Sequence, residues 1–420
     1  METIQVPTAQ PTVAYRSLVF TLCMLVYIFS GTVSTLMSTY LPVVVRDLLG
    51  QADKAELDRV SAYIGATFLY GWMLGGMSFG YFGDRLGRVR SLVGAVILYG
   101  GCTLLTAFAP NWITVVLLRF AVGFGIGGVL VLTTVIVAEI WPERNRPVAL
   151  GILAVAFPVG IMLSGLVNNL LPDWRQAFWI GGLPLLVGLL IASLMQEPEG
   201  WKQVNRQAAS ADISLFDPHY RRSLWLGSLA FGSMLVGLWA VFSWVPTWVQ
   251  SLVIGDAQKA RGLSMMLMGS GGVIGGILSG FVVKAIGHRR TMLFVFAACF
   301  VMVAVVFKTN SVLTPLVYVE IALLALLFGM SQGTMSAYLP DLFPTQLRGR
   351  ATGFCFNIGR LVTATAVFFI GTLVTALGGY GSAIFAFSGT FVIGFIAIWI
   401  GNALTAPGRR TVEDPVSGLK

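Results

Sequence analysis

The stretch SFGYFGDRLGRVRSL (Ser78–Leu92) has a weaker second copy, LSGFVVKAIGHRRTM (Leu278–Met292), later in the chain. Each copy follows one long apolar segment and precedes another. A repeat at a fixed offset indicates that the two halves of a chain share one fold. Three positions match at a constant offset of 200 residues: Gly80 with Gly280, Gly87 with Gly287, and Arg90 with Arg290.

Two further pairs of segments extend the repeat. AEIWPERNR (Ala138–Arg146) matches PDLFPTQLR (Pro340–Arg348) at an offset of 202. YLPVVV and WVPTWV match through Pro42 and Pro246. Parallel repeats of this kind are typical of transporters whose substrate site lies between the halves, near the bilayer midplane.

The composition predicts a membrane protein. Of the 420 residues, 56% are hydrophobic and 11% are charged, whereas soluble domains carry about 25% charged residues. A spanning helix needs about 20 apolar residues. Twelve such runs are expected, at residues 17–45, 60–82, 91–109, 112–138, 147–170, 176–196, 222–252, 262–284, 291–309, 312–338, 351–377 and 380–403.

We therefore predict an all-α membrane protein with twelve transmembrane helices in two six-helix pseudo-symmetric bundles. The bundles are expected at 1–196 and 222–404, with a cytoplasmic linker loop at 197–221 and a cytoplasmic tail at 405–420. With the N-terminus inside, the inner loops and tails hold 18 Lys and Arg and the outer loops hold 7. This positive-inside bias predicts a multi-pass protein of the cell (inner) membrane with both termini in the cytoplasm.

The cysteines predict no disulfide framework, because all 4 lie inside expected spans. The 2 histidines fall in expected loops. We expect no metal and no cofactor. The net charge of +9 follows the loops and is not read as a nucleic-acid signal. The expected partners are a small-molecule substrate, a coupling proton and the lipid bilayer, and the expected state is a monomer.

The loop GYFGDRLGRVR (Gly80–Arg90) resembles the signature loop of the major facilitator superfamily, although Val89 stands where a basic residue is usual. RFAVGFGIGG (Arg119–Gly128) is similar to the helix-4 motif of that family. DWRQAFWIGGLP (Asp173–Pro184) and DLFPTQLRGRATGFCFNIGRL (Asp341–Leu361) resemble the metabolite–proton symporters, namely the sialate, aromatic-acid and organic-ion carrier branches. Those branches usually carry an Asp in helix 1, but SGTVSTLMSTYLP (Ser30–Pro42) has no acid.

Three charged side chains fall well inside the expected spans: Arg119, Glu320 and Arg360. A charge inside the membrane is costly and indicates a functional site. Arg119 and Glu320 occupy nearly equivalent places in the repeat, so we expect them to pair, which leaves Arg360 for a substrate carboxylate. Alternatively, Glu320 pairs with Arg360, and substrate or a proton competes for that pair. Structural hydrogen bonding by either arginine, and a static Glu–Arg pair, are the competing interpretations.

The resemblance implies that helices 1, 4, 7 and 10 surround a central cavity, with helix 11 partly lining it. The resemblance also implies a role in coupling for Arg119. Glu320 is a candidate proton carrier because a buried carboxyl group can take up a proton when a nearby arginine is drawn to a substrate anion. Each of the other candidates has a structural alternative: backbone hydrogen bonding, packing, or an interfacial position. The substrate-binding candidates are Arg360, Arg119, Asn357, Ser34, Gln332, Trp239 and Phe242.

The resemblance also implies that the charged inner loops latch one conformation by joining the two halves. The alternative is that these charges are solvated and only set the topology. The candidate gating residues are Asp84, Arg85, Arg88, Glu139, Arg144, Asp341 and Arg348.

The sequence predicts a secondary active transporter that uses alternating access for proton-coupled uptake of a small organic anion, a carboxylate. The alternatives are an exporter or antiporter of drugs or metabolites, or a symporter of a neutral solute. Helix 5 keeps Pro158 but lacks the Gly-Pro spacing of family antiporters, which disfavours antiport. A membrane receptor is a further class, and no enzyme is expected, because no nucleophile–base set or phosphate loop appears.

Overall fold

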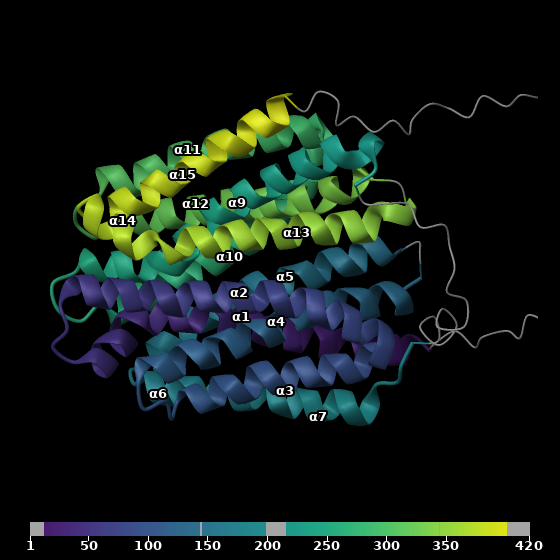
Figure 1. The fold of residues 1–420 in the computed structure, drawn as a ribbon, viewed down its shortest axis with the longest axis horizontal. Coiled ribbons are helices and arrows are strands. Elements are labelled where there is room, and N and C mark those ends of the chain that lie inside the picture. Colours follow the sequence, from purple (N-terminus) through teal and green to yellow (C-terminus); the bar gives the residue numbers. More distant parts are fainter. Residues whose placement is uncertain (1–11, 143–144, 199–215, 344, 401–420) are drawn as a thin grey trace, which may run out of the picture.

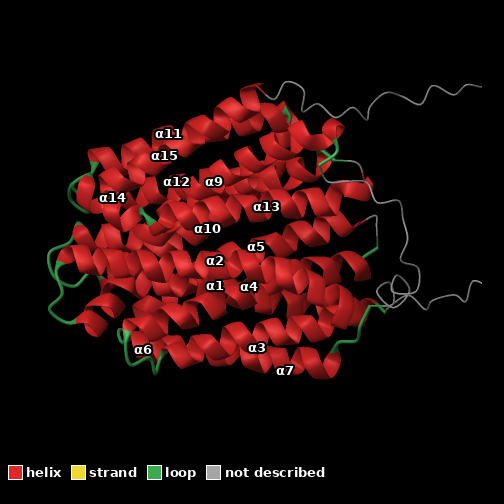
Figure 2. Ribbon diagram, in the orientation of Figure 1, coloured by secondary structure: helices red, strands yellow, loops and turns green. Residues whose placement is uncertain are grey.

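The computed structural model describes residues 12–142, 145–198, 216–343 and 345–400. These residues form long helices that run side by side, joined by short loops (Figure 1). No strand occurs within the described ranges (Figure 2). Eleven described helices are long and apolar enough to cross a membrane. Helix α2 (Lys54–Leu86) runs alongside them as the twelfth, as expected from the sequence.

The first six spans form what we call the N-terminal half, and the last six the C-terminal half. In the N-terminal half, α6, η2 and α7 together make one span. Its elements are α1 (Val13–Leu49), α2, α3 (Arg88–Thr106), α4 (Trp112–Ile140), α5 (Arg146–Leu170), α6 (Trp174–Ala177), η2 (Phe178–Gly181) and α7 (Gly182–Leu194).

In the C-terminal half, α14 continues the span of α13 after a break at Phe369. Its elements are α9 (Pro218–Ser251), α10 (Gln258–Ile286), α11 (His288–Thr309), α12 (Pro315–Asp341), α13 (Thr345–Phe368), α14 (Ile370–Ala376) and α15 (Tyr380–Ile400). We call the end of the bundle that holds the α1–α2 and α11–α12 connections the outer end. The opposite end, where the described chain begins and finishes, is the inner end (Figure 1).

The repeat is visible in the helix packing. A Cβ on Gly75 would lie 1.9 Å from the carbonyl oxygen of Phe124, where α2 meets α4. A Cβ on Gly275 would lie 1.9 Å from the carbonyl oxygen of Leu326, where α10 meets α12. The two contacts are related by the sequence offsets of 200 and 202. Small residues let helix backbones approach closely in lipid, and here both halves use the same close approach.

The signature loop is a tight turn stabilised by a distant carboxylate. Gly87 has φ 113°, a backbone conformation that favours glycine. A Cβ there would lie 2.3 Å from an oxygen of Glu197. That carboxylate accepts hydrogen bonds from the backbone N–H groups of Val89 and Arg90, at 3.1 and 3.0 Å, and so caps the first turn of α3. The equivalent Gly287 also has a positive φ, 81°.

The two halves pack against each other chiefly through three pairs of helices, and α14 also contacts α2. Helix α5 runs along α10, α2 along α13, and α1 contacts α9. A single cluster of buried apolar side chains crosses from one half to the other through these contacts. The interface between the halves is therefore packed and largely apolar, so a polar group within it needs a hydrogen-bond or charge partner.

Candidate functional site

Arg360 lies on α13 where that helix meets α2. Its guanidinium carbon is 5.5 Å from the centre of the Trp72 ring and 5.9 Å from that of Phe356. Such distances permit cation–π attraction, but a ring face supplies neither a negative charge nor a hydrogen-bond acceptor of full strength. Within the described residues, Arg360 has no ion pair and no hydrogen bond. Its charge is half-buried and unneutralised.

Aromatic rings from both halves pack around Trp72, next to Arg360, and form what we call the aromatic cage. Trp72 of α2 lies 5.3 Å from Trp239 of α9 and 5.6 Å from Phe157 of α5, measured between ring centres. Tyr27 of α1 packs on Phe157 at 6.0 Å. The cage consists of Tyr27, Trp72, Phe157, Trp239 and Phe356. Four of its five members had no signal in the sequence, because a lone aromatic residue in a spanning helix resembles any core residue.

Two buried polar atoms beside Arg360 lack a hydrogen-bond partner. One is the indole Nε1 of Trp72, and the other is the side-chain oxygen of Asn357. The amide nitrogen of Asn357 donates to the carbonyl of Gly353, on its own helix, at 2.9 Å. Asn357 and Arg360 lie one turn apart on α13, opposite Trp72 and Gly76, which are one turn apart on α2.

Arg119 is 2% exposed and holds α4 to α1. Its two terminal nitrogens donate to the backbone carbonyls of Val33 and Ser34, both at 3.2 Å. Its guanidinium carbon lies 4.2 Å from the centre of the Phe68 ring. These contacts match the structural interpretation of Arg119, which commits much of its hydrogen-bonding capacity to backbone.

The expected ion pair between Arg119 and Glu320 is not formed, and neither is the alternative pair between Glu320 and Arg360. Glu320 is 8% exposed, and its Oε2 accepts from the side-chain amide of Asn310 at 2.6 Å. Asn310 follows the last residue of α11, at the outer end. The prediction was wrong because equivalent places in a repeat need not face each other, and a neighbouring amide already meets the needs of Glu320.

The remaining substrate-binding candidates divide into two groups. Trp239 and Phe242 pack on each other at 6.4 Å between ring centres, and Trp239 belongs to the cage. Ser34 donates to the carbonyl of Ser30 at 2.6 Å, so its hydroxyl proton serves its own helix. Gln332 contacts the hydroxyl of Ser336, also on its own helix, at 3.4 Å. Neither polar side chain contacts Arg360.

The inner-end charges form a cluster within the N-terminal half. Arg88 pairs with Asp84 at 2.6 Å and with Glu139 at 3.2 Å. Arg85 lies over the ring of Tyr81, with 4.5 Å between its guanidinium carbon and the ring centre. Arg144 lies outside the described residues, as do the side chains of Asp341 and Arg348. A latch between the halves at this end therefore stays a prediction.

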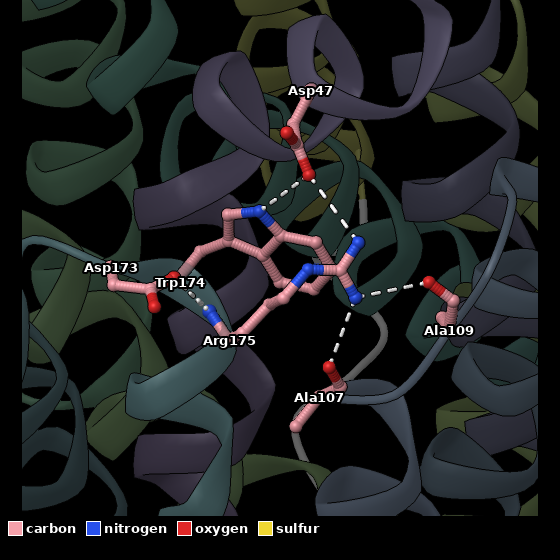
Figure 3. Close-up of polar contacts among 6 residues, drawn as sticks. All are labelled: Asp47, Ala107, Ala109, Asp173, Trp174 and Arg175. Carbon is pink, nitrogen blue, oxygen red and sulfur yellow. Dashed lines mark hydrogen bonds and ion pairs between the residues drawn. The ribbon is translucent and has the colours of Figure 1, made fainter.

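The motif around Asp173 has a structural role at the outer end (Figure 3). The indole N–H of Trp174 donates to Asp47 at 3.1 Å, and Arg175 reaches the same carboxylate oxygen at 3.4 Å. Arg175 also donates to the carbonyls of Ala107 and Ala109, at 3.0 and 3.1 Å. These bonds tie α1, the α3–α4 loop and α6 together, which accounts for the motif without assigning it to substrate.

Comparison with known proteins agrees with this architecture. The sequence model of the major facilitator superfamily matches residues 23–366. The cis,cis-muconate transport protein of Acinetobacter baylyi is 29% identical over 329 residues, which cover 74% of this chain and 78% of that protein. The 4-hydroxybenzoate transporter PcaK of Pseudomonas putida is 25% identical, with 92% of this chain and 88% of that protein covered.

Among solved structures, a D-xylose–proton symporter superposes with a TM-score of 0.75 at 19% sequence identity, covering 93% of this chain and 98% of the symporter. At that identity the likeness shows the fold alone. The matched family, the relatives and the twelve-helix architecture agree, and a protein of this kind is a multi-pass membrane transporter and not an enzyme. The chain belongs to the major facilitator superfamily.

Proposed function

We propose that the protein takes up a small organic carboxylate together with protons, by alternating access, and that Arg360 binds the carboxylate. The observation that carries the proposal is the unneutralised charge of Arg360 between the two halves. Arginine stays protonated even when it is buried, so the free-energy cost of burying its charge must be offset by a partner. A carboxylate suits the planar fork of the guanidinium in both charge and geometry.

The relatives support an anionic substrate. The muconate and 4-hydroxybenzoate transporters act, by their names, on compounds that carry carboxylate groups. The aromatic cage adds a surface on which a flat apolar skeleton can stack beside the charge. The positive-inside bias supports an orientation with the inner end in the cytoplasm and the protein in the cell (inner) membrane.

Proton coupling enters the proposal through two buried carboxyl groups. Asp58 is 3% exposed and Glu320 is 8% exposed, and neither forms an ion pair within the described residues. An unpaired carboxylate is costly to bury, and a proton removes that cost. Glu320 lies in a spanning helix and is the candidate that the sequence identified; Asp58 is an addition from the structure.

The test is ligand-induced thermal stabilisation of the purified full chain. A ligand that binds only the native state stabilises it by about 2.7 kcal/mol at a hundredfold excess over Kd. The panel contains 4-hydroxybenzoate and cis,cis-muconate as anions, D-xylose as a neutral solute and choline as a cation. We expect the anions alone to raise Tm in the wild type, and Arg360→Gln to remove the shift.

Arg59→Gln is the matched control, because Arg59 is exposed and makes only a 3.9 Å contact within one turn of α2. It should respond to anions as the wild type does. Equal stabilisation of wild type and Arg360→Gln by D-xylose or choline would refute the carboxylate proposal. In proteoliposomes, carboxylate uptake should rise with an inward proton gradient and fall when a protonophore collapses it; uptake indifferent to the gradient would refute coupling.

A further inference from the structure

The indole N–H of Trp72 is a buried donor with no acceptor. Trp72 is 5% exposed, and its Nε1 makes no hydrogen bond. Buried tryptophan N–H groups usually find a partner, and an unmade bond at such a site costs free energy. The ring that carries this N–H also lies against the guanidinium of Arg360, at 5.5 Å from the guanidinium carbon to the ring centre. The donor therefore belongs to the ring that packs against the unneutralised charge.

The side-chain oxygen of Asn357 is a buried acceptor with no donor. The amide nitrogen of the same side chain already donates to the carbonyl of Gly353. The side-chain oxygen is therefore the atom that lacks a partner. Gly76 of α2 faces this oxygen, and an added Cβ there would lie 3.7 Å from it. The absence of a side chain at Gly76 leaves room beside the acceptor.

We propose that Trp72 and Asn357 determine specificity for a planar carboxylate that also bears a hydroxyl group. Trp72 donates to a carboxylate oxygen alongside Arg360, and Asn357 accepts a hydrogen bond from the hydroxyl group. The inference rests on the proposed function, because it takes the Arg360 site as the carboxylate site. It goes further by naming a second recognition element. A cation alone attracts any anion, whereas an orphaned acceptor is satisfied only by a ligand that brings a donor.

The geometry of the cage sets the rest of the ligand class. Aromatic rings from α2, α5 and α9 lie within 5.3 to 6.4 Å of one another, between centres. Flat rings pack offset or edge-on against such walls. These rings form an apolar wall beside Arg360 on which a planar conjugated skeleton can stack, with its carboxylate at Arg360 and its hydroxyl toward Asn357.

The experiment measures binding of three probes to the purified full chain by titration calorimetry. The probes are 4-hydroxybenzoate, benzoate, which lacks the hydroxyl, and 4-hydroxybenzyl alcohol, which lacks the carboxylate. We expect the wild type to bind 4-hydroxybenzoate about tenfold more tightly than benzoate, the effect of one hydrogen bond. Asn357→Leu should weaken 4-hydroxybenzoate to the level of benzoate and leave benzoate unchanged.

Trp72→Phe keeps an aromatic ring and removes the N–H, so it should weaken both carboxylates by about tenfold. Trp248→Phe is the control, since Trp248 is buried against Phe307 away from Arg360. Gly76→Ala offers an independent route, because its Cβ makes only ordinary contacts and fills the space beside the Asn357 oxygen. It should reduce the preference for the hydroxylated probe without touching either polar side chain.

The outcomes separate the two proposals. If 4-hydroxybenzoate and benzoate bind equally well and both need Arg360, recognition of the hydroxyl group is refuted and the carboxylate proposal stands. If Asn357→Leu and Gly76→Ala keep the wild-type preference for 4-hydroxybenzoate, the assignment of Asn357 is overturned. Unchanged binding in Trp72→Phe overturns the assignment of Trp72. If 4-hydroxybenzyl alcohol binds as tightly as 4-hydroxybenzoate, or Arg360→Gln binds the carboxylates normally, the proposed function itself fails.

Discussion

Tyr380, the first residue of α15, donates its phenolic hydrogen to the carboxylate of Asp58 on α2 and so bonds the two halves at the outer end. The amino group of Lys54 lies 5.6 Å from the centre of the Tyr380 ring. Nearby, a Cβ on Gly371 of α14 would lie 2.7 Å from the Asp58 carbonyl oxygen, so the backbones also meet closely. These contacts join the two halves at the outer end, and the alternating access that we propose requires them to break.

Tyr380→Phe should loosen this closure. The change removes one hydrogen bond to a charged group, which is worth about 1.5–3 kcal/mol, and therefore shifts the balance toward an open outer end by about tenfold or more. Spin labels at Arg59→Cys and Leu377→Cys, both exposed positions on opposite halves, would report the distance between them. We expect a longer-distance population to grow in Tyr380→Phe.

Tyr40→Phe is the control for that experiment. Tyr40 donates to the carbonyls of Val167 and Leu171, so its hydrogen bonds lie within the N-terminal half. Its loss should not move the labels apart. An unchanged distance distribution in Tyr380→Phe would show that the Asp58 contact does not hold the outer end closed.

The same contact should respond to pH. Asp58 precedes the expected span at 60–82, and burial raises its pKa above the ordinary value of 3.8, while the Tyr380 hydrogen bond and Lys54 lower it in part. In an open state Asp58 is solvated and its pKa returns toward that value. Protonation therefore favours closure, fully below about pH 3.8, and this contribution is lost as the pH rises through the closed-state pKa.

The labelled pair should thus show a larger open population as the pH is raised from acidic values, and Asp58→Asn should remove the part of the response that Asp58 supplies. The charged or titratable groups that act on Asp58 are Lys54 and Tyr380, and Arg46 acts on Tyr380. Lysine, arginine and tyrosine titrate well above this range in their ordinary environments. A pH response of equal size in Asp58→Asn would rule out Asp58 as the titrating group.

The sequence predicted the helices well and the contacts of the charges poorly. Hydropathy and length locate each span independently, so every expected run found its helix, and the repeat reappeared as the Gly75 and Gly275 contacts. The partner of a charged side chain depends on helix rotation and tilt, which no local pattern encodes. Glu320 therefore went to Asn310 instead of an arginine. Trp72 was missed for the same reason, because its role depends on Arg360, which lies opposite it on α13.

Gly75→Ala should destabilise the protein far more than Gly80→Ala. A Cβ at position 75 would lie 1.9 Å from a backbone oxygen of α4, so the two helices must separate. Overpacking of this kind costs about 1–3 kcal/mol. A Cβ at Gly80, on the same helix, meets no atom within 4 Å. Thermal unfolding in detergent should show a lower Tm for Gly75→Ala and little change for Gly80→Ala.

Gly275→Ala extends that comparison to the second half of the repeat. Its Cβ would meet the Leu326 carbonyl oxygen at the same 1.9 Å, so its loss of Tm should be close to that of Gly75→Ala. If either alanine variant at these positions melts like the wild type, the helices are less tightly held than their spacing implies.

Glu320→Gln separates the proton-carrier role from the static role of this carboxyl group. Glutamine keeps the size of the side chain and an oxygen acceptor for Asn310, so the local bond and the fold should survive. It cannot take up a proton. If Glu320 carries the proton, the variant should still bind the carboxylate and exchange it across proteoliposomes, yet fail to accumulate it against a gradient when a proton gradient is imposed.

Asn310→Ala is the matched change on the other side of the bond. It removes the amide that donates to Glu320 but leaves the carboxyl group in place, so proton-driven accumulation should persist. Proton-driven accumulation by Glu320→Gln at the wild-type level would leave Glu320 with a structural role alone. Coupling would then have to be sought at Asp58, the other carboxyl group buried without an ion pair in the described part of the chain.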